Sequence, residues 1–388
     1  MSNPMSEFTP EEGFGIFEGA TSSTIHRRLG NTELSPADAQ LVENTVNASI
    51  SANSARAYAS DWKGFVRWCE AKGYSPMPAT SNIVILYLRE KAETVKLDGT
   101  YAYSVATLVR WASSINQRHI QANVTPPKTD ERVMRALKAI RHMRGSGQRR
   151  VSPLMTDELK NVLRTAATDA WPAAVFARRD AAILLTGYAG AFRRSELSSL
   201  NIADAIPQIH DGFHLHLRRS KTDQDGRGQV KALPYGADAV SCGPCALSRW
   251  LDIVDAADRG EGRAGVMRVI HEAPPLTEHI CRNTKRATRY VERPLFRSIS
   301  TGGTVKAARL SGHGINEVIK RRVTAVGLNP KDFGGHSLRA GFVTQAFRSG
   351  ADSRSIRRQT GHKGDAILDI YDRENAPMAN NAVTRIGL

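Results

Sequence analysis

The chain is poor in cysteine and in acidic residues, and each shortage excludes a class of protein. Its 388 residues include four cysteines, and 38 Asp and Glu stand against 54 Lys and Arg, which gives a formal net charge of +16. So few cysteines argue against a small secreted domain held together by disulfides. This excess of positive charge indicates a polyanionic partner, either nucleic acid or an anionic membrane surface, unless the charge only solubilises the protein.

Long apolar runs are also missing. The longest, AAILLTGYAGAF, ends at Arg193 and is too short to cross a membrane. The first residues, MSNPMSEFTPEEGFG, are acidic and lack the apolar core of a signal peptide. We therefore expect a cytoplasmic protein without a membrane partner, in a reducing compartment.

The spacing of the cysteines does not favour metal binding. Cys242-Gly-Pro-Cys245 has the form of half a zinc or redox site. The other nearby candidates, His279 and Cys281, do not form a second knuckle at usable spacing. The sequence therefore predicts no metal ligands and no cofactor.

What the chain does contain is enough apolar sequence for two domains, at 41% hydrophobic and 24% charged residues. Residues 1–35 have no periodicity and are predicted to be a disordered arm. Apolar residues then recur with helical spacing in four segments, which predicts a small helical domain over residues 36–145. Residues 146–155 form a flexible, basic linker, with Arg149 and Arg150 placed to contact phosphate. The four helical segments are 54–69, 83–95, 105–115 and 133–140.

The second domain, residues 156–376, mixes helices with a short hairpin. Phe213, Leu215 and Leu217 alternate with polar residues, and a turn at Asp225-Gly226 separates this strand from a second one over residues 230–234. Residues 255–293 are polar and basic and could form a loop. Helices are predicted over 156–167 with Thr156 as N-cap, 173–190, 246–254, 315–326, 337–349, 353–359 and 366–371.

Polar motifs in this domain are weak singly but specific in their order. A buried helix ends in Ala191-Phe-Arg193-Arg-Ser-Glu196, and the first strand ends in Arg218-Arg-Ser-Lys221. Next come Gly335-His336-Ser-Leu-Arg339, whose i, i+3 spacing puts His336 and Arg339 on one helix face, then Gly361-His362 and Tyr371. This order resembles the tyrosine recombinase (phage integrase) family, and within it the Cre-like members, over residues 54–388 except 255–293.

The resemblance implies a mainly α fold with a small β-sheet. An N-terminal helical core-binding (SAM-like) domain and an α+β catalytic domain would form a C-shaped clamp on duplex DNA. It also implies roles for seven residues in cutting DNA by transesterification. Tyr371 would be the nucleophile that forms a 3′-phosphotyrosine, Arg193 and Arg339 the phosphate clamps, Lys221 the general acid, His336 the proton-transfer partner of the tyrosine, His362 a phosphate hydrogen-bond donor, and Glu196 a brace for the arginine and histidine side chains.

DNA contacts outside the catalytic set are less specific. Arg56, Lys63 and Arg118 could contact phosphates or the major groove, or could be ordinary solvated helix charges. Ser311 and His313 precede a predicted helix, so His313 could enter the major groove at a helix N-terminus.

The expected function is site-specific recombination between two DNA sites with inverted-repeat arms, by a homotetramer, through a Holliday junction, in a bacterial, phage or plasmid setting. Residues 377–388 would form a small apolar tail that docks on a neighbouring subunit, or else folds back on its own domain. The alternatives are a telomere resolvase, a type IB topoisomerase-like enzyme and a catalytically silent DNA-binding regulator.

Overall fold

The computed structural model describes residues 34–47, 50–145, 151–218, 228–284, 289–362 and 364. The chain divides into two compact units, Met1–Gln148 and Arg149–Leu388. Each unit is described by itself, and the clamp arrangement of the two stays a prediction. No helix in the described residues is both long and apolar enough to span a membrane.

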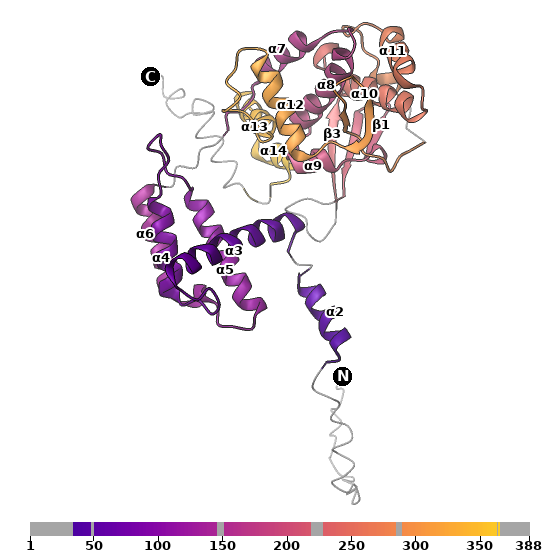
Figure 1. Cartoon of the computed structure of the whole chain (residues 1–388). Helices are drawn as coiled ribbons and strands as arrows, with labels where there is room; N and C mark the ends of the chain where they lie inside the picture. Colours follow the sequence, from indigo (N-terminus) through magenta and orange to yellow (C-terminus); the bar gives the residue numbers. More distant parts are fainter. Residues whose placement is uncertain are drawn as a thin grey trace, which may run out of the picture. The chain divides into compact units, whose positions relative to one another are not determined.

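The described part of the first unit is helical apart from an isolated antiparallel bridge between Val95 and Tyr101. Hydroxyl or carboxylate side chains cap four of its helices: Ser51, Thr80 and Ser104 accept N–H bonds at three N-termini, and Asp130 does so at the fourth. Phe65, Tyr87 and Leu108 lie in its core. The helices are α2 (Pro36–Asn47), α3 (Ala52–Lys72), α4 (Ser81–Glu93), α5 (Val105–Gln121) and α6 (Glu131–Arg144), with a short 3-10 turn at Pro127–Thr129 (Figure 1).

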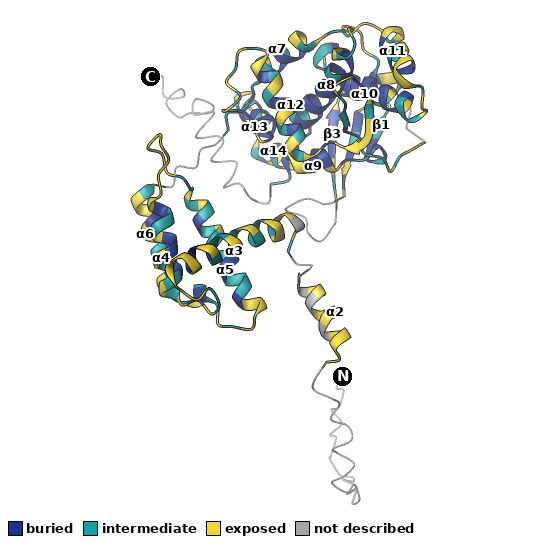
Figure 2. Ribbon diagram, viewed as in Figure 1, coloured by how far each residue is buried: buried dark blue, intermediate teal, exposed yellow. Residues whose placement is uncertain are grey.

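The second unit is built around one central helix, α8 (Ala173–Ala189), which is buried along most of its length (Figure 2). Glycines allow close packing around this helix: a Cβ on Gly187 would lie 2.7 Å from a methyl group of Leu338, and one on Gly341 would lie 1.9 Å from the carbonyl oxygen of Leu154 in the segment before residue 156. The other helices are α7 (Thr156–Ala166), α9 (Arg194–Ser199), α10 (Gly243–Asp258), α11 (Gly262–Glu272), α12 (Gly312–Thr324), α13 (Ser337–Arg348) and α14 (Ser353–Thr360).

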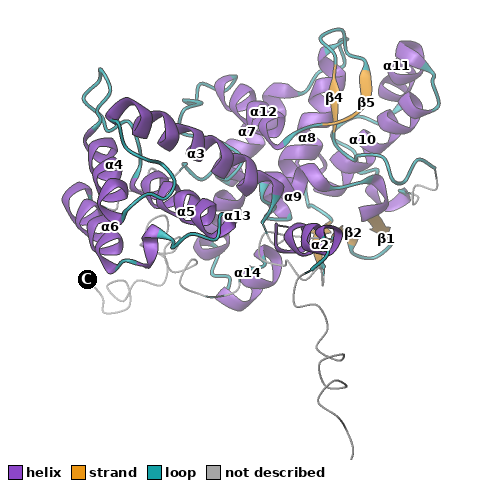
Figure 3. Cartoon of the chain, turned by 60° about the horizontal axis from the view of Figure 1, so that its bottom comes forward, coloured by secondary structure: helices purple, strands orange, loops and turns teal. Residues whose placement is uncertain are grey.

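Two small antiparallel sheets complete this unit (Figure 3). The first has the order β1-β2-β3, with Ala205 of β1 opposite Leu215 and Leu217 of β2 opposite Gln229. Phe213, Leu215 and Leu217 are buried. The strands are β1 (Ala205–Gln208), β2 (Gly212–Leu217) and β3 (Gln229–Pro234) in one sheet, and β4 (Arg297–Ile299) and β5 (Val305–Arg309) in the other.

The mainly α fold with a small sheet is confirmed, with three corrections. Residues 255–293 are not simply a loop, because they contain α11 and a 3-10 turn, η4 (Cys281–Asn283). Strands β1, β4 and β5 were not predicted; β4 has only three residues, too few for a periodic signal. Thr156 is the first helical residue and not the N-cap, since Met155 precedes the helix and its N–H donates to Glu158.

Several predicted features lie outside the described residues. They are the arm over 1–33, Arg149 and Arg150 of the linker, the turn at Asp225-Gly226, and everything from the 366–371 helix to the 377–388 tail.

Candidate active site

A sharp turn after α8 brings Arg193 to the site. Ala191 has a left-handed backbone (φ 46°), its N–H donates to the Tyr188 carbonyl, and the Phe192 N–H donates to the Gly187 carbonyl. This pattern ends a helix, and it normally uses glycine where Ala191 stands. Phe192 is buried, and the next residue, Arg193, is the N-cap residue of α9.

Glu196 holds Arg193 in two ways. Its Oε1 accepts from Arg193 Nη1 at 2.5 Å, and its Oε2 accepts from the Arg193 backbone N–H at 2.9 Å. The Glu196 side chain is 4% exposed, and that of Arg193 is 19% exposed. A buried carboxylate therefore orients a guanidinium that still reaches solvent.

Arg339 reaches the same turn from α13. It is 1% exposed, and its Nη1 donates to the Ala191 carbonyl at 2.7 Å. His336 is the N-cap residue of α13, one turn before Arg339; it keeps an exposed edge, although much of its ring lies within the protein. The preceding Gly335 lies tight against Arg194, where a Cβ would come within 2.7 Å of the Arg194 Cβ. The spacing of His336 and Arg339 thus does place both beside Arg193.

His362 enters from the end of α14. Gly361 adopts a left-handed backbone (φ 70°) that ends the helix, and His362 follows it, with Nδ1 3.1 Å from the Thr360 hydroxyl oxygen.

Lys231 of β3 joins these segments beneath the surface. Its side chain is completely buried, and Nζ donates to the carbonyls of Gly190 at 2.9 Å, Ala191 at 3.4 Å and Gln359 at 2.9 Å. The ammonium also lies 4.7 Å from the centre of the Phe192 ring. One side chain therefore ties the turn before Arg193 to the helix end before His362.

Positive charge is concentrated here. Burial, followed by the charges of Arg339 and Arg193, lowers the pKa of His362 to about 3 and lowers that of His336 as well. Burial also lowers the pKa of Lys231 to about 7; Glu196 opposes that shift, and Arg339 and Arg193 add to it. Each positive charge makes protonation of the neighbouring groups less favourable, and an anion placed among them would relieve this repulsion. The arrangement suits a phosphate diester.

Comparison with known proteins agrees with this chemistry. Residues 266–377 match the phage integrase family. The chain is 30% identical over 337 residues to an integrase/recombinase xerD homolog of Selenomonas ruminantium, covering 86% of this chain and 85% of that protein. This chain belongs to the tyrosine recombinase family. Its enzymatic activity is site-specific DNA recombination.

Other relatives are more distant. The tyrosine recombinase XerC of Roseiflexus castenholzii is 24% identical, covering 84% of this chain and 85% of that protein. Among solved structures, XerH recombinase bound to a palindromic difH substrate has a TM-score of 0.49 at 16% identity, covering 79% of this chain and 72% of that one. A lambda integrase dimer bound to a COC′ core site has a TM-score of 0.46 at 15% identity, covering 91% and 85%. The narrower Cre-like assignment stays a prediction.

Five of the seven predicted catalytic residues of this recombinase are in the described part of the chain, and the structure brings them together: Arg193, Glu196, His336, Arg339 and His362. Tyr371 and Lys221 lie outside it. Lys231 was not predicted. The sequence could have indicated its burial, because the alternation of strand residues places Lys231 on the same buried face of β3 as Leu233.

The predicted DNA contacts are spread over both units. Arg56 and Lys63 are exposed on α3, and Arg118 is half-buried on α5, where it donates to Gln121 at 3.4 Å. Ser311 is the N-cap of α12 and its hydroxyl accepts the Gly314 N–H at 3.1 Å, while His313 is exposed in the first turn. Their contacts with DNA stay predictions.

The inference from cysteine spacing was wrong in one respect. Cys242, Cys245, His279 and Cys281 do come together, with all four potential ligand atoms within 4.8 Å of one another. After α10 the chain reverses through α11 and returns His279 and Cys281 to the start of α10, which spacing along the chain could not indicate.

Proposed function

We propose that this recombinase cleaves and rejoins DNA through a covalent 3′-phosphotyrosine intermediate formed by Tyr371, at the phosphate site built from Arg193, Arg339, His336 and His362. The strongest support is that Arg339 and Lys231 both donate to the carbonyl of Ala191, in the turn that leads into Arg193. Arg339 is thereby held next to Arg193, although the two arginines are far apart in the sequence.

The steps follow from these groups. The Tyr371 oxygen attacks phosphorus, the bond to the 5′ oxygen breaks, and Lys221 gives that oxygen a proton. His336, whose pKa is lowered by burial and by both arginines, is neutral near neutral pH and can accept the tyrosine proton. The two guanidiniums stabilise the additional negative charge on the non-bridging oxygens in the transition state.

Since the phosphotyrosine keeps the energy of the diester, a 5′ hydroxyl of a second duplex can attack it and rejoin the strand. Exchange of one strand pair gives a Holliday junction, and exchange of the second resolves it. We propose a tetramer on two sites with inverted-repeat arms, because two strands of each site must be cut and one tyrosine serves each cut. Residues 377–388 would link neighbouring subunits.

The test uses the full-length protein and a duplex nicked just beyond the cleavage position. Cleavage then releases a short fragment that carries the free 5′ hydroxyl; this fragment diffuses away and the covalent complex accumulates. We expect a slowly migrating protein–DNA band on a denaturing gel for wild type and none for Tyr371→Phe, with DNA binding by gel shift unchanged. A covalent band with the Phe variant would overturn the assignment.

A further inference from the structure

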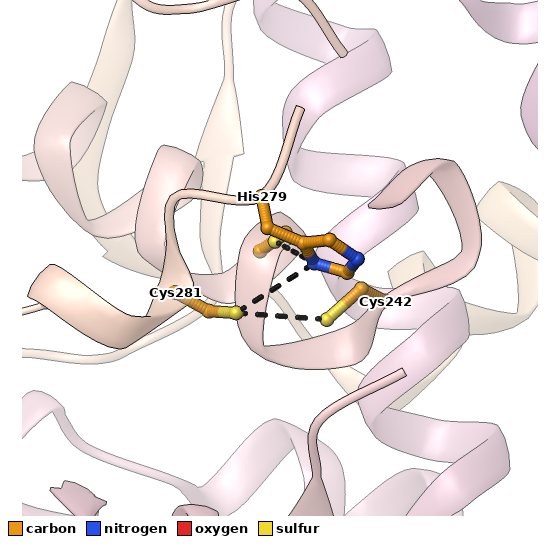
Figure 4. A group of neighbouring side chains, drawn as sticks. Cys242, His279 and Cys281 are labelled. Atoms are coloured by element: carbon orange, nitrogen blue, oxygen red, sulfur yellow. Dashed lines mark hydrogen bonds between the residues drawn. The ribbon is translucent and has the colours of Figure 1, made fainter. Parts of the chain in front are cut away.

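A cluster of three cysteines and one histidine lies at the start of α10 (Figure 4). Cys242 is the N-cap residue of α10 and Cys245 lies in its first turn. His279 and Cys281 come from the segment that follows α11, His279 being 34 positions after Cys245 in the sequence. None of these residues belongs to the phosphate site described above.

The distances in the cluster fit a tetrahedral zinc ion. The Cys242 and Cys281 sulfurs are 3.9 Å apart, and His279 Nδ1 lies 3.3 Å from the Cys245 sulfur and 3.9 Å from the Cys281 sulfur. With Zn–S near 2.3 Å and Zn–N near 2.0 Å, the edges of a tetrahedron are about 3.8 Å between sulfurs and about 3.5 Å between sulfur and nitrogen. The same sulfur separation is far longer than a disulfide bond of about 2.05 Å, and all four cysteines of the chain are free.

The groups around the cluster orient its ligand atoms. His279 Nε2 lies 3.4 Å from the Ala237 carbonyl oxygen, so an N–H there leaves Nδ1 as the lone-pair donor toward the thiols. The Gly236 N–H donates to the Cys242 sulfur at 3.3 Å, and a Cβ on Gly236 would lie only 2.9 Å from the Cys242 Cα.

Ordinary packing explains the cysteines but not the histidine. The three cysteines are buried, as small apolar residues often are. His279 is exposed, yet it turns one ring nitrogen onto the buried sulfurs.

We propose that Cys242, Cys245, His279 and Cys281 bind one structural zinc ion that fastens residues 273–284 to the N-terminal end of α10. Four protein ligands close the coordination shell, as in structural and not catalytic zinc sites. The same segment is already held by Arg249 of α10, which donates to the carbonyls of Pro274 at 2.7 Å and Pro275 at 2.8 Å. The metal would thus link the two ends of the segment that runs from α10 through α11 to Cys281.

The experiment measures metal in the full-length protein purified under reducing conditions, without chelators. Elemental analysis should find one zinc per chain. Cobalt exchanged into the site should give the intense visible absorption of tetrahedral cobalt and the near-ultraviolet absorption of cobalt–thiolate bonds. Zinc at background level, with no thiolate absorption after cobalt addition, would overturn the proposal; so would a disulfide between Cys242 and Cys281 in the reduced preparation.

Variants separate ligation from general loss of structure. His279→Ala changes an exposed side chain, so the protein should fold, but its zinc affinity should fall at least about 100-fold. His279→Cys supplies a fourth thiolate and should retain zinc. His271→Ala, an exposed histidine of α11, and Cys69→Ala in the first unit are the matched controls and should keep one zinc per chain. Zinc affinity is measured by competition with a chromophoric chelator, and equal affinities of His279→Ala and His271→Ala would contradict the assignment.

Discussion

Lys231 offers a quantitative test of how the site is built. Replacing it with methionine keeps much of the side-chain volume but removes the three N–H donors that bond Gly190, Ala191 and Gln359. Ala191 would keep its bond from Arg339, whereas the other two carbonyls would lose the donor described here. At neutral pH that loss is offset by removal of a buried ammonium, so the stability change there is not the informative quantity.

The informative quantity is its pH dependence. Burial lowers the pKa of Lys231 from 10.5 to about 7 in the folded protein. Between these values the unfolded chain binds a proton that the folded chain does not, so the wild-type free energy of unfolding rises with pH. At 1.36 kcal/mol per pKa unit, Lys231 should add about 2 kcal/mol between about pH 7 and about pH 9, and Lys231→Met should lack this gain.

Urea unfolding of the full chain at both pH values, read by pulse proteolysis of the second unit, measures this difference. Wild type should gain about 2 kcal/mol over Lys231→Met on going to the higher pH. Lys306→Met, at an exposed position of β5, is the matched control and should keep the wild-type pH dependence. An equal gap between wild type and Lys231→Met at both pH values would refute the reasoning and show that the three carbonyls hold the ammonium charged.

Three further predictions concern catalysis and assembly. Arg193→Ala and Arg339→Ala should each slow single-turnover cleavage by on the order of a hundredfold or more, because each removes a charged donor from the transition state. Normal cleavage rates would exclude the proposed role of these arginines in binding the phosphate. His362, with its pKa lowered to about 3, should stay neutral by NMR from about pH 8 to about pH 5 in the DNA-free protein, whereas titration near the usual value of about 6.5 would contradict the crowding of cations. Deleting residues 377–388 should leave binding of one subunit to one arm intact in a gel-shift titration but reduce cooperative filling of the second arm; unchanged cooperativity would favour a tail folded on its own domain.

The sequence was most informative where pattern and chemistry are local. Helical stripes predicted α3 to α6 and most helices of the second unit, and the i, i+3 spacing predicted that His336 and Arg339 lie near each other, although His336 is the N-cap residue and not part of the helix. Short strands such as β4 and β5 give no periodicity that can be recognised, and α11 begins among charged residues after glycines.

The cysteine–histidine cluster and Lys231 depend on contacts between distant segments. His279 reaches Cys245 only because the chain reverses through α11, and Lys231 meets Gln359 across 128 positions of sequence. Periodicity along the chain gives the buried face of a strand, but not what that face packs against.

Identification of the residue that becomes linked to DNA tests the central claim most directly. The covalent complex formed on a nicked duplex is digested with protease and nuclease, and the peptide carrying the nucleotide is sequenced by mass spectrometry. We expect the nucleotide to be attached through its 3′ phosphate to Tyr371. Attachment at another residue, or through a 5′ phosphate, would contradict the proposed mechanism.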